Sequence, residues 1–432
     1  MTHIADHPPR TRSGIGISTV AMLCWLGVFS EGYNLGVMGA VLPGILKDPE
    51  WHLTMVEAGA LASAALVGMF VGGIGIGAIS DHWGRRRCFI GCFALLTLTM
   101  AAAAAVHQLA LFAVLRFLSG IGIGGIIPVA AALTSEFAAP ERRNREFTLM
   151  YSGYAVGIFV AALVSYFLLA RLGWRAVMGI GGGLAVLLPV VIAALPESVA
   201  YLLRSGQPEK AMFTAARFQV AMPAAGDPGP KEKGGSVMAL FGPSLRRATA
   251  GFALTYIFGM ILVYGLNTWL PQIMRSAGYD LGPSILFLGV FALSSAVGGV
   301  VLGAISDSIG QQRTICAAFA VGVAAVLGLS YHMPQLLTYM VVAVAGIGTV
   351  SASVLLTSYA SAFYPPHLKS TAVGFCGSIS RSGAIAGPMI GGLVAAQGLP
   401  FIWNFMIYAL AGVISACCIL IVPGRSAGEH GA

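Results

Sequence analysis

The sequence predicts an all-α membrane protein that crosses the bilayer twelve times. Of its 432 residues, 57% are hydrophobic and only 9% are charged, and the mean hydropathy is +0.85. A soluble domain with this composition would expose large apolar patches to water. The apolar runs recur along the whole chain with short polar gaps, and they lack the alternating pattern of barrel strands. We therefore expect a polytopic bundle of helices, because lipid offers no partner to unpaired backbone groups.

Each expected span is an apolar run long enough to cross about 30 Å of hydrocarbon as a helix. A longer polar interval, residues 196–247, divides the spans six and six. We expect an amino-terminal half (residues 1–195), this interval as a cytoplasmic linker, and a carboxy-terminal half (residues 248–432). Within the linker, residues 207–220 are expected to form a surface helix and residues 224–236 a flexible segment. The predicted spans are residues 15–46, 55–80, 88–106, 109–135, 147–170, 174–195, 248–273, 282–306, 314–331, 334–363, 369–396 and 400–422.

The distribution of basic residues predicts the orientation of the chain. With both termini in the cytoplasm, 18 of the 24 Lys and Arg residues lie on the inner side and 4 on the outer side. Such a bias is typical of cytoplasmic loops. The formal net charge of +8 is then explained by loops that face anionic lipid, and it does not indicate nucleic-acid binding. The expected location is the cell (inner) membrane.

The two halves repeat each other in sequence. Residues 72–87 read GGIGIGAISDHWGRRR, and residues 298–313 read GGVVLGAISDSIGQQR, with GAISD identical and the same spacing to the next Gly and Arg. A weaker echo links LTSEF at residues 133–137 with LTSYASAF at residues 356–363. Two parallel six-helix halves with a site at their interface are typical of transporters.

Charges that we assign to the interior of spans, away from the first residues of a span, are costly when ionised and indicate function. They are Glu31 in the first span, Arg116 and Glu136 in the fourth, and Arg381 in the eleventh. Because Arg381 has no acidic residue within the spans of its own half, the sequence favours it as the ligand of a substrate carboxylate. Glu31 and Glu136 are candidate proton carriers, with Arg116 adjusting the pKa of one of them. Glu136 is equally well explained as the partner in a gate salt bridge.

Several motifs resemble those of a known family. The pattern G-x-x-x-D-x-x-G-R-R, which begins at Gly77, resembles the loop 2–3 signature of the major facilitator superfamily. Further stretches are similar to the aromatic acid:proton symporter family within it. These are EGYNLGVMGAVLP (residues 31–43), RFLSGIGIGGIIPVAAALTSEF (116–137), GWR (173–175), LPES (195–198), NTWLP (267–271) and SRSGAIAGP (380–388).

The resemblance implies the twelve-helix fold of that superfamily and alternating access. It implies proton-coupled import of a small aromatic carboxylate, such as a benzoate or hydroxybenzoate, by a protein that works as a monomer in the bilayer. It also implies that Asp81 lies near the amino end of the eleventh span, and that Arg85 and Arg86 pair with that region in one state only. The second copy keeps Asp307 but has glutamines in place of the two arginines, so we expect the corresponding pairing in the second half to be weaker.

One departure from the family pattern bears on coupling. Asn34 stands where the family has a second acid, and an amide cannot carry a proton, so the proton stoichiometry stays open. The candidate residues are Glu31, Arg116 and Glu136 for proton coupling, Arg381, Tyr33, Asn34, Tyr264, Asn267 and Trp269 for substrate binding, and Gly77, Asp81, Gly84, Arg85, Arg86 and Asp307 for the gating loops.

Other functions have weaker support in the sequence. A symporter of a non-aromatic acid, such as a muconate, is the first alternative. A proton/drug antiporter is the second, but the Gly-rich pattern GxxxGPxxGG occurs in the eleventh span, at residues 383–392, rather than in the fifth. A membrane sensor would leave the buried acids without a use. An enzyme is disfavoured because no nucleophile and base set is apparent, and the seven cysteines suit small core positions, so no metal or cofactor is expected.

Overall fold

The computed structural model describes residues 19–218, 220, 222 and 237–423, apart from the side chains of Ala78, Asp81 and Ser370. The start of the first predicted span, residues 15–18, and the predicted flexible segment, residues 224–236, therefore lie outside the described residues. In the described part of the chain, all regular secondary structure is helical.

The helices follow the apolar runs of the sequence closely. The first part of the chain forms α1 (Thr19–Ile45), α2 (Met55–Trp83), α3 (Arg85–Ala105), α4 (Leu109–Phe137), α5 (Arg143–Gly182), η1 (Gly183–Leu187), α6 (Leu188–Ala194), α7 (Val199–Arg204) and α8 (Pro208–Phe218). The second part forms η2 (Val237–Phe241), α9 (Arg246–Ser276), α10 (Leu281–Ile309), α11 (Gln311–Gly328), α12 (Gln335–Gly346), η3 (Ile347–Ser351), α13 (Ala352–Phe363), α14 (Pro366–Ala396) and α15 (Ile402–Ile419). The surface helix expected at residues 207–220 is present as α8.

Ten helical segments of the described chain are long and apolar enough to cross a membrane. One of them, residues 143–194, contains two of the predicted spans, and Gly173 separates these with a non-helical conformation (φ 77°, ψ 173°). The helix α14, which carries Arg381, is not among the ten. The all-helical membrane fold is confirmed, and the count of twelve crossings stays a prediction.

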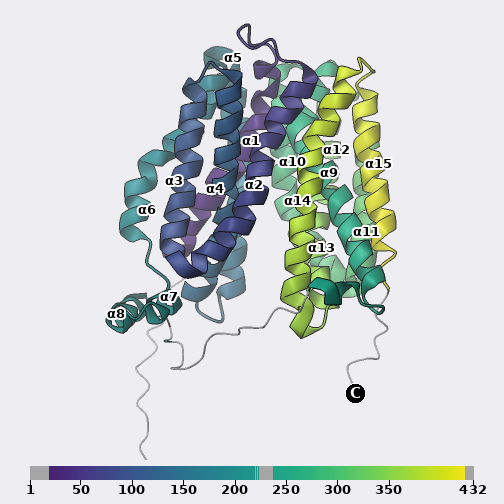
Figure 1. Ribbon diagram of the computed structural model, residues 1–432. Coiled ribbons are helices and arrows are strands. Elements are labelled where there is room, and N and C mark those ends of the chain that lie inside the picture. Colours follow the sequence, from purple (N-terminus) through teal and green to yellow (C-terminus); the bar gives the residue numbers. More distant parts are fainter. Residues whose placement is uncertain (1–18, 219, 221, 223–236, 424–432) are drawn as a thin grey trace, which may run out of the picture.

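The long helices form two groups that stand side by side (Figure 1). Helices α1 to α6 make one group and α9 to α15 the other (Figure 1). The short helices α7 and α8 lie across one end of the first group (Figure 1). We call this end the α7 end, and we call the opposite end, which carries the loop of residues 46–54, the Asp48 end.

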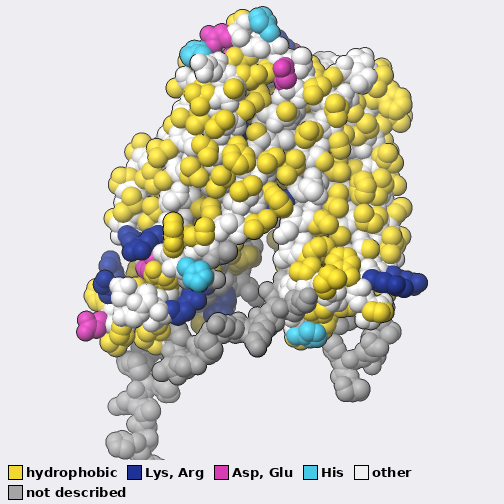
Figure 2. Space-filling model, viewed as in Figure 1, with side chains coloured by type: hydrophobic (Ala, Val, Ile, Leu, Met, Phe, Trp, Pro, Cys, Tyr) yellow, Lys and Arg dark blue, Asp and Glu magenta, His cyan; other side chains and the backbone are white. Residues whose placement is uncertain are grey.

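The two halves meet along helix pairs α1 and α9, α2 and α14, and α5 and α10. Near the Asp48 end, α2 and α14 approach each other backbone to backbone. A β-carbon on Gly59 would lie 2.7 Å from the main-chain oxygen of Pro388, and one on Gly392 would lie 2.6 Å from that of Met55. Small residues allow such close approach between membrane helices. Towards the α7 end the halves part, and a hollow opens between them (Figure 2).

The sequence repeat is also a repeat of backbone geometry. Gly84 (φ 96°, ψ 139°) ends α2 and begins α3, and Gly310 (φ 90°, ψ 147°) does the same between α10 and α11. In both, the glycine N–H donates to the carbonyl of a serine four residues earlier, Ser80 or Ser306. Because φ is positive, a side chain would be strained at either position.

Asp48 fastens the loop of residues 46–54 to α5. Its carboxylate accepts hydrogen bonds from Trp174 Nε1 (2.7 Å), from Arg175 Nη1 (2.8 Å) and from the backbone N–H of Glu50 (2.9 Å). The Arg175 guanidinium also lies 4.4 Å from the centre of the Trp174 ring. Burial acts to raise the pKa of Asp48, but these hydrogen bonds and the charge of Arg175 outweigh it and hold the pKa below its ordinary value.

We predict that Asp48 stabilises the fold at neutral pH and not in acid. Since its pKa is lowered on folding, its contribution is present above the unfolded value of about 4 and is lost as the pH falls through the lowered value. Asp48→Asn should lower the free energy of unfolding by about 1–3 kcal/mol at pH 7 and flatten the acid dependence. Thermal unfolding in detergent between pH 7 and pH 3 measures both. Asp280→Asn is the control, because Asp280 is exposed and its side chain makes no capping bond; equal shifts for the two variants would contradict the assignment.

Candidate functional site

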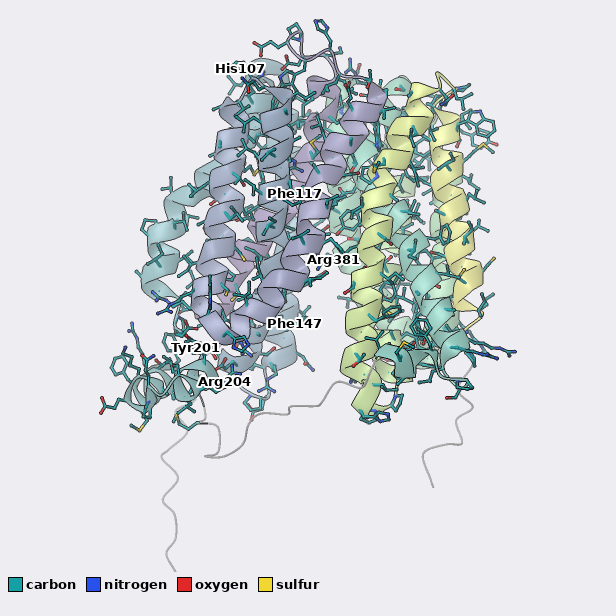
Figure 3. All side chains as sticks on the ribbon, in the orientation of Figure 1. His107, Phe117, Phe147, Tyr201, Arg204 and Arg381 are labelled. Carbon is teal, nitrogen blue, oxygen red and sulfur yellow. The ribbon has the colours of Figure 1, made fainter. Side chains whose placement is uncertain are left out.

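Arg381 lies where the two halves begin to part. Its side chain extends from α14 towards α2, and Nη1 donates a hydrogen bond to the Met69 main-chain oxygen (2.5 Å) (Figure 3). Among the described residues Arg381 forms no ion pair, and it is partly exposed. Most of the N–H groups of its guanidinium are therefore available to another acceptor.

Glu31 is the acidic counterpart of Arg381, and it comes from the other half. It lies in the middle of α1, and only 2% of its surface is exposed. Its Oε2 atom has no hydrogen-bond partner in the described part of the chain. Arg381 is the charged side chain that acts on it electrostatically. A carboxyl group and a guanidinium from opposite halves thus lie close enough to interact electrostatically across the interface.

Three tyrosines lie close to Glu31. Tyr151 and Tyr154 of α5 and Tyr264 of α9 all interact electrostatically with Glu31, and Tyr154 and Tyr264 lie near each other across the interface. We call Glu31, Tyr151, Tyr154, Tyr264 and Arg381 the central cluster. Tyr264 was predicted for the site, and the other two tyrosines were not.

Phe147, Tyr151 and Tyr154 lie one after another along α5, and we call these three stacked side chains the aromatic ladder. The rings of Phe147 and Tyr151 are stacked with centroids 6.4 Å apart, and those of Tyr151 and Tyr154 are stacked at 6.3 Å. Phe147 and Tyr151 are both exposed in the described structure. The signal was present in the sequence, because residues 147, 151 and 154 share one helix face by their spacing of four and three. Such stacked rings offer aromatic faces on which a flat ring can pack.

Arg116 has a different partner from the one expected. Its Nη1 atom donates to the Asn34 side-chain oxygen (2.6 Å), and both residues are buried. Glu136 follows Arg116 by twenty residues in the same helix, which is about 30 Å, so the two side chains cannot meet. Arg116 is therefore held by an uncharged amide, at the position where the family pattern has an acid.

Glu136 instead joins the α2–α3 loop to α7. Its carboxylate accepts a hydrogen bond from Arg85 Nη1 (2.9 Å), from Ser198 Oγ (3.1 Å) and from the Ala200 N–H at the start of α7 (3.1 Å). Of the two interpretations of Glu136, this geometry favours the salt-bridge partner.

The signature loops of both halves are fastened within their own half. Arg86 donates to the Leu195 main-chain oxygen at the end of α6 (2.7 Å). In the second half, Gln311 donates to Ser358 Oγ of α13 (3.1 Å) and Gln312 to the Val422 oxygen just after α15 (2.7 Å). In the described part of the chain, Arg85 and Arg86 bond acceptors in α4 and at the end of α6, and their pairing with the amino end of α14 in another state stays a prediction. The Asp81 side chain lies outside the described residues, Asp307 is exposed, and Gly77 has open space around it.

Three predicted substrate residues pack away from the hollow. The Tyr33 hydroxyl donates to the Val177 oxygen (2.9 Å), and Trp269 Nε1 donates to the Pro388 oxygen (2.8 Å), with at most 2% of either side chain exposed. Asn267 is buried where α9 meets Gly39 of α1, and its side-chain oxygen has no partner in the described chain. All three side chains lie on packed faces of their helices in this structure, and their role in substrate binding stays a prediction.

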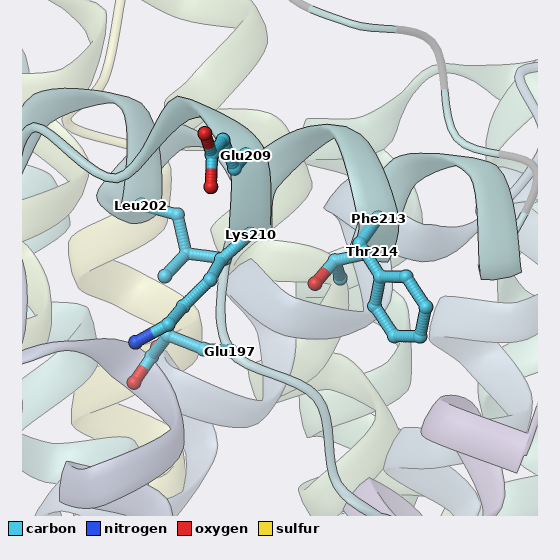
Figure 4. Close-up of a pocket in the computed structure, with 6 residues that line it drawn as sticks. All are labelled: Glu197, Leu202, Glu209, Lys210, Phe213 and Thr214. Carbon is cyan, nitrogen blue, oxygen red and sulfur yellow. The ribbon is translucent and has the colours of Figure 1, made fainter.

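The pocket of about 360 Å³ between α7 and α8 is not part of this site. Figure 4 shows it on the outside of the bundle, lined by Glu197, Leu202, Glu209, Lys210, Phe213 and Thr214. None of these residues contacts the central cluster. In the described residues no group of three His, Cys, Asp or Glu side chains could hold a metal ion.

The fold and the central cluster define a class of protein. It is a multi-pass membrane protein of two repeated helical halves, with groups of opposite charge facing each other at the interface between them. That is the architecture of a secondary transporter.

The chain belongs to the Major Facilitator Superfamily, whose sequence profile matches residues 24–388. It is 30% identical to the benzoate transport protein of Acinetobacter baylyi over 418 residues, 94% of this chain and 89% of that protein. It is 31% identical to the 4-hydroxybenzoate transporter of Pseudomonas aeruginosa over 89% of this chain and 87% of that protein. It is 30% identical to the gallate transporter of Pseudomonas putida, over 93% and 90%. The resemblance drawn from the motifs is confirmed.

Solved structures agree with the fold. The xylose transporter XylE from E. coli, in a partially occluded inward-open conformation, has a TM-score of 0.72 at 15% identity and covers 94% of this chain and 99% of its own. The nucleoside transporter NupG has a TM-score of 0.73 at 13% identity, over 94% of this chain and all of its own. The expectation of a transporter rather than an enzyme is confirmed by this membership and by the relatives.

We predict that the Arg85 and Glu136 pair stabilises the α7 end by about 1 kcal/mol, since both side chains are only partly exposed. Arg85→Gln, which copies Gln311 of the second half, should lower the thermal unfolding midpoint by about 1 °C. Arg87→Gln is the matched control, because Arg87 is an exposed neighbour. The double variant with Glu136→Gln should lose less than the sum of the two single losses. Strict additivity would show that the pair is not coupled.

Proposed function

We propose that this protein is a proton-coupled symporter that imports a small aromatic carboxylate, such as a benzoate or hydroxybenzoate, by alternating access. Its relatives are named as transporters of benzoate, gallate, gentisate and 4-hydroxybenzoate, and each spans most of the chain. The observation that carries the proposal is the central cluster, in which Arg381 and Glu31 come from opposite halves and both act electrostatically on Tyr264.

In this proposal Arg381 binds the substrate carboxylate. A guanidinium can hold a carboxylate by two parallel hydrogen bonds, and Arg381 uses few of its donors within the protein. The ring of the substrate packs on Tyr151 and Tyr154, and their hydroxyl groups offer hydrogen bonds to ring substituents. Glu31 carries the proton, since a carboxyl buried among apolar groups changes its charge when a nearby cation becomes engaged elsewhere.

The proposed coupling is one proton for each substrate anion. Asn34 takes the place of a second acid, so Glu31 is the single intramembrane carboxyl of the central cluster. A monoanion moving with one proton is electroneutral, and only the pH gradient drives it. A second proton would add about 2.3 kcal/mol per 100 mV of membrane potential.

We assign the α7 end to the cytoplasm and the protein to the inner membrane. The basic side chains of the loops gather at that end, as the positive-inside rule requires. The hollow that opens there is then the path by which substrate reaches the cytoplasm (Figure 2).

Uptake into proteoliposomes tests the proposal. Purified protein should accumulate labelled benzoate when the pH outside is lower than inside, and a protonophore should abolish accumulation. Gentisate, 4-hydroxybenzoate and a muconate serve as competitors that rank the substrate class. The proposal would be contradicted if only the muconate competed with benzoate uptake, or if accumulation did not depend on the pH gradient.

We predict that Glu31→Gln abolishes accumulation driven by the pH gradient and keeps exchange of labelled for unlabelled benzoate. A neutral amide resembles the protonated carboxyl, so the substrate-loaded carrier can still change state but cannot release a proton. Counterflow at equal pH measures exchange. Glu209→Gln, at an exposed position of α8, is the control. A Glu31→Gln protein that still concentrates benzoate would exclude Glu31 as the coupling acid.

We predict that Arg381→Lys weakens benzoate binding by about 1–3 kcal/mol, because the charge remains but the planar fork is lost. Arg381→Ala should abolish measurable binding. The measurement is benzoate affinity by calorimetry on purified protein, normalised to folded material. Arg313→Lys, an exposed position of the same half, is the control. Wild-type affinity in folded Arg381→Lys protein would exclude the carboxylate contact.

A further inference from the structure

Helices α2 and α14 form an antiparallel seam that ends at Arg381. From the Asp48 end inwards, the seam pairs Met55 with Gly392 and Gly59 with Pro388, and then the Ser63 hydroxyl donates to the Ile385 oxygen (2.8 Å). The next contact towards the α7 end is that of Arg381 with α2. Figure 3 shows the Arg381 side chain between α14 and α2. Towards the α7 end the halves part (Figure 2).

The guanidinium of Arg381 rests on a glycine. A β-carbon on Gly73 would lie 2.8 Å from Cζ, 2.8 Å from Nη2 and 2.9 Å from Nη1 of Arg381. Three such similar distances mean that the guanidinium plane lies over the Gly73 α-carbon. The Met69 oxygen, which accepts the bond from Nη1, is one turn earlier in the same helix. Gly73 and Met69 thus form a shallow seat for the guanidinium.

This requirement is particular to Gly73. Membrane helices commonly use glycine to pack against other helices, but a β-carbon added to Gly75 or Gly77 of the same stretch would have nothing within 4 Å. At Gly73 the group that fills the space is the end of a flexible side chain rather than backbone. A methyl group there would therefore displace the guanidinium and leave the helices in place.

We infer that Gly73 is a positioning residue for Arg381, and that the seat it forms with Met69 sets the direction in which the guanidinium presents its remaining N–H groups to the substrate carboxylate. The inference rests on the proposed role of Arg381 in carboxylate binding. The seat belongs to the amino-terminal half and the guanidinium to the carboxy-terminal half. Carboxylate binding therefore requires that α2 and α14 are in contact. The Arg381 guanidinium is held in its orientation only while this contact exists.

Benzoate affinity of full-length variants tests the functional part. Gly73→Ala should weaken binding about tenfold or more, and Gly75→Ala should change it by less than about twofold, since a methyl group there meets open space. In an Arg381→Lys background, Gly73→Ala should cause little further loss of benzoate affinity, because lysine has no planar guanidinium for the added methyl group to displace. The inference would be overturned if Gly73→Ala reduced benzoate affinity equally with Arg381 and with Lys at position 381. It would also be overturned if Gly73→Ala alone had no effect.

Chemical labelling of Arg381 tests the seat without a substrate. Phenylglyoxal modifies accessible guanidinium groups, and mass spectrometry of the peptide that contains Arg381 gives its rate. The rate should rise several-fold in Gly73→Ala and stay unchanged in Gly75→Ala, with thermal unfolding confirming that both variants are folded. An unchanged rate in Gly73→Ala would overturn the seat. Absence of benzoate binding by the wild-type protein would count against the proposed function, and the labelling would still decide on the seat.

Discussion

The burial of charge in an apolar bundle is the constraint on which this structure depends. An isolated carboxylate or guanidinium within lipid thickness is costly, and the cost falls when opposite charges approach. Glu31 and Arg381 meet that condition only across the interface, since each lies in a half that offers it no ion-pair partner among the described residues. The site therefore has to lie between the halves, and any relative motion of the halves changes the electrostatic energy of both groups.

The two ends of the interface are stabilised by different kinds of contact. At the Asp48 end, glycines bring backbones into contact, and hydrogen bonds such as that from Ser63 to Ile385 cross between the halves. At the α7 end, the polar contacts of Arg85 with Glu136 and of Gln311 with Ser358 stay within one half. Each half is thus a firm body at the α7 end, and the hollow can open there without loss of these bonds.

The sequence was sufficient for the fold class, the repeat and the two central charges, because each leaves a local signal: a long apolar run, a duplicated GAISD stretch, an ionisable residue where none is expected. It was not sufficient to predict which groups the candidate side chains would bond. Arg116 was assigned to an acid and bonds Asn34, and Tyr33 and Trp269 were assigned to the substrate and bond backbone carbonyls. Which face of a helix meets which neighbour depends on tilt and rotation, and these are set by packing over the whole bundle.

The pairing of Arg116 with an amide completes an account of why the proposed substrate and proton travel together. With Glu31 ionised, Arg116 and Arg381 leave the interior of the empty carrier one unit positive. Addition of a carboxylate and a proton restores the same charge, so the empty and the fully loaded carrier meet the same electrostatic cost when the halves move. A proton alone leaves both Arg116 and Arg381 without a counter-charge, which raises the net charge of the interior to two units positive. An acid at position 34 would neutralise Arg116 and lower that charge by one unit, so Asn34 favours binding of the proton together with the anion.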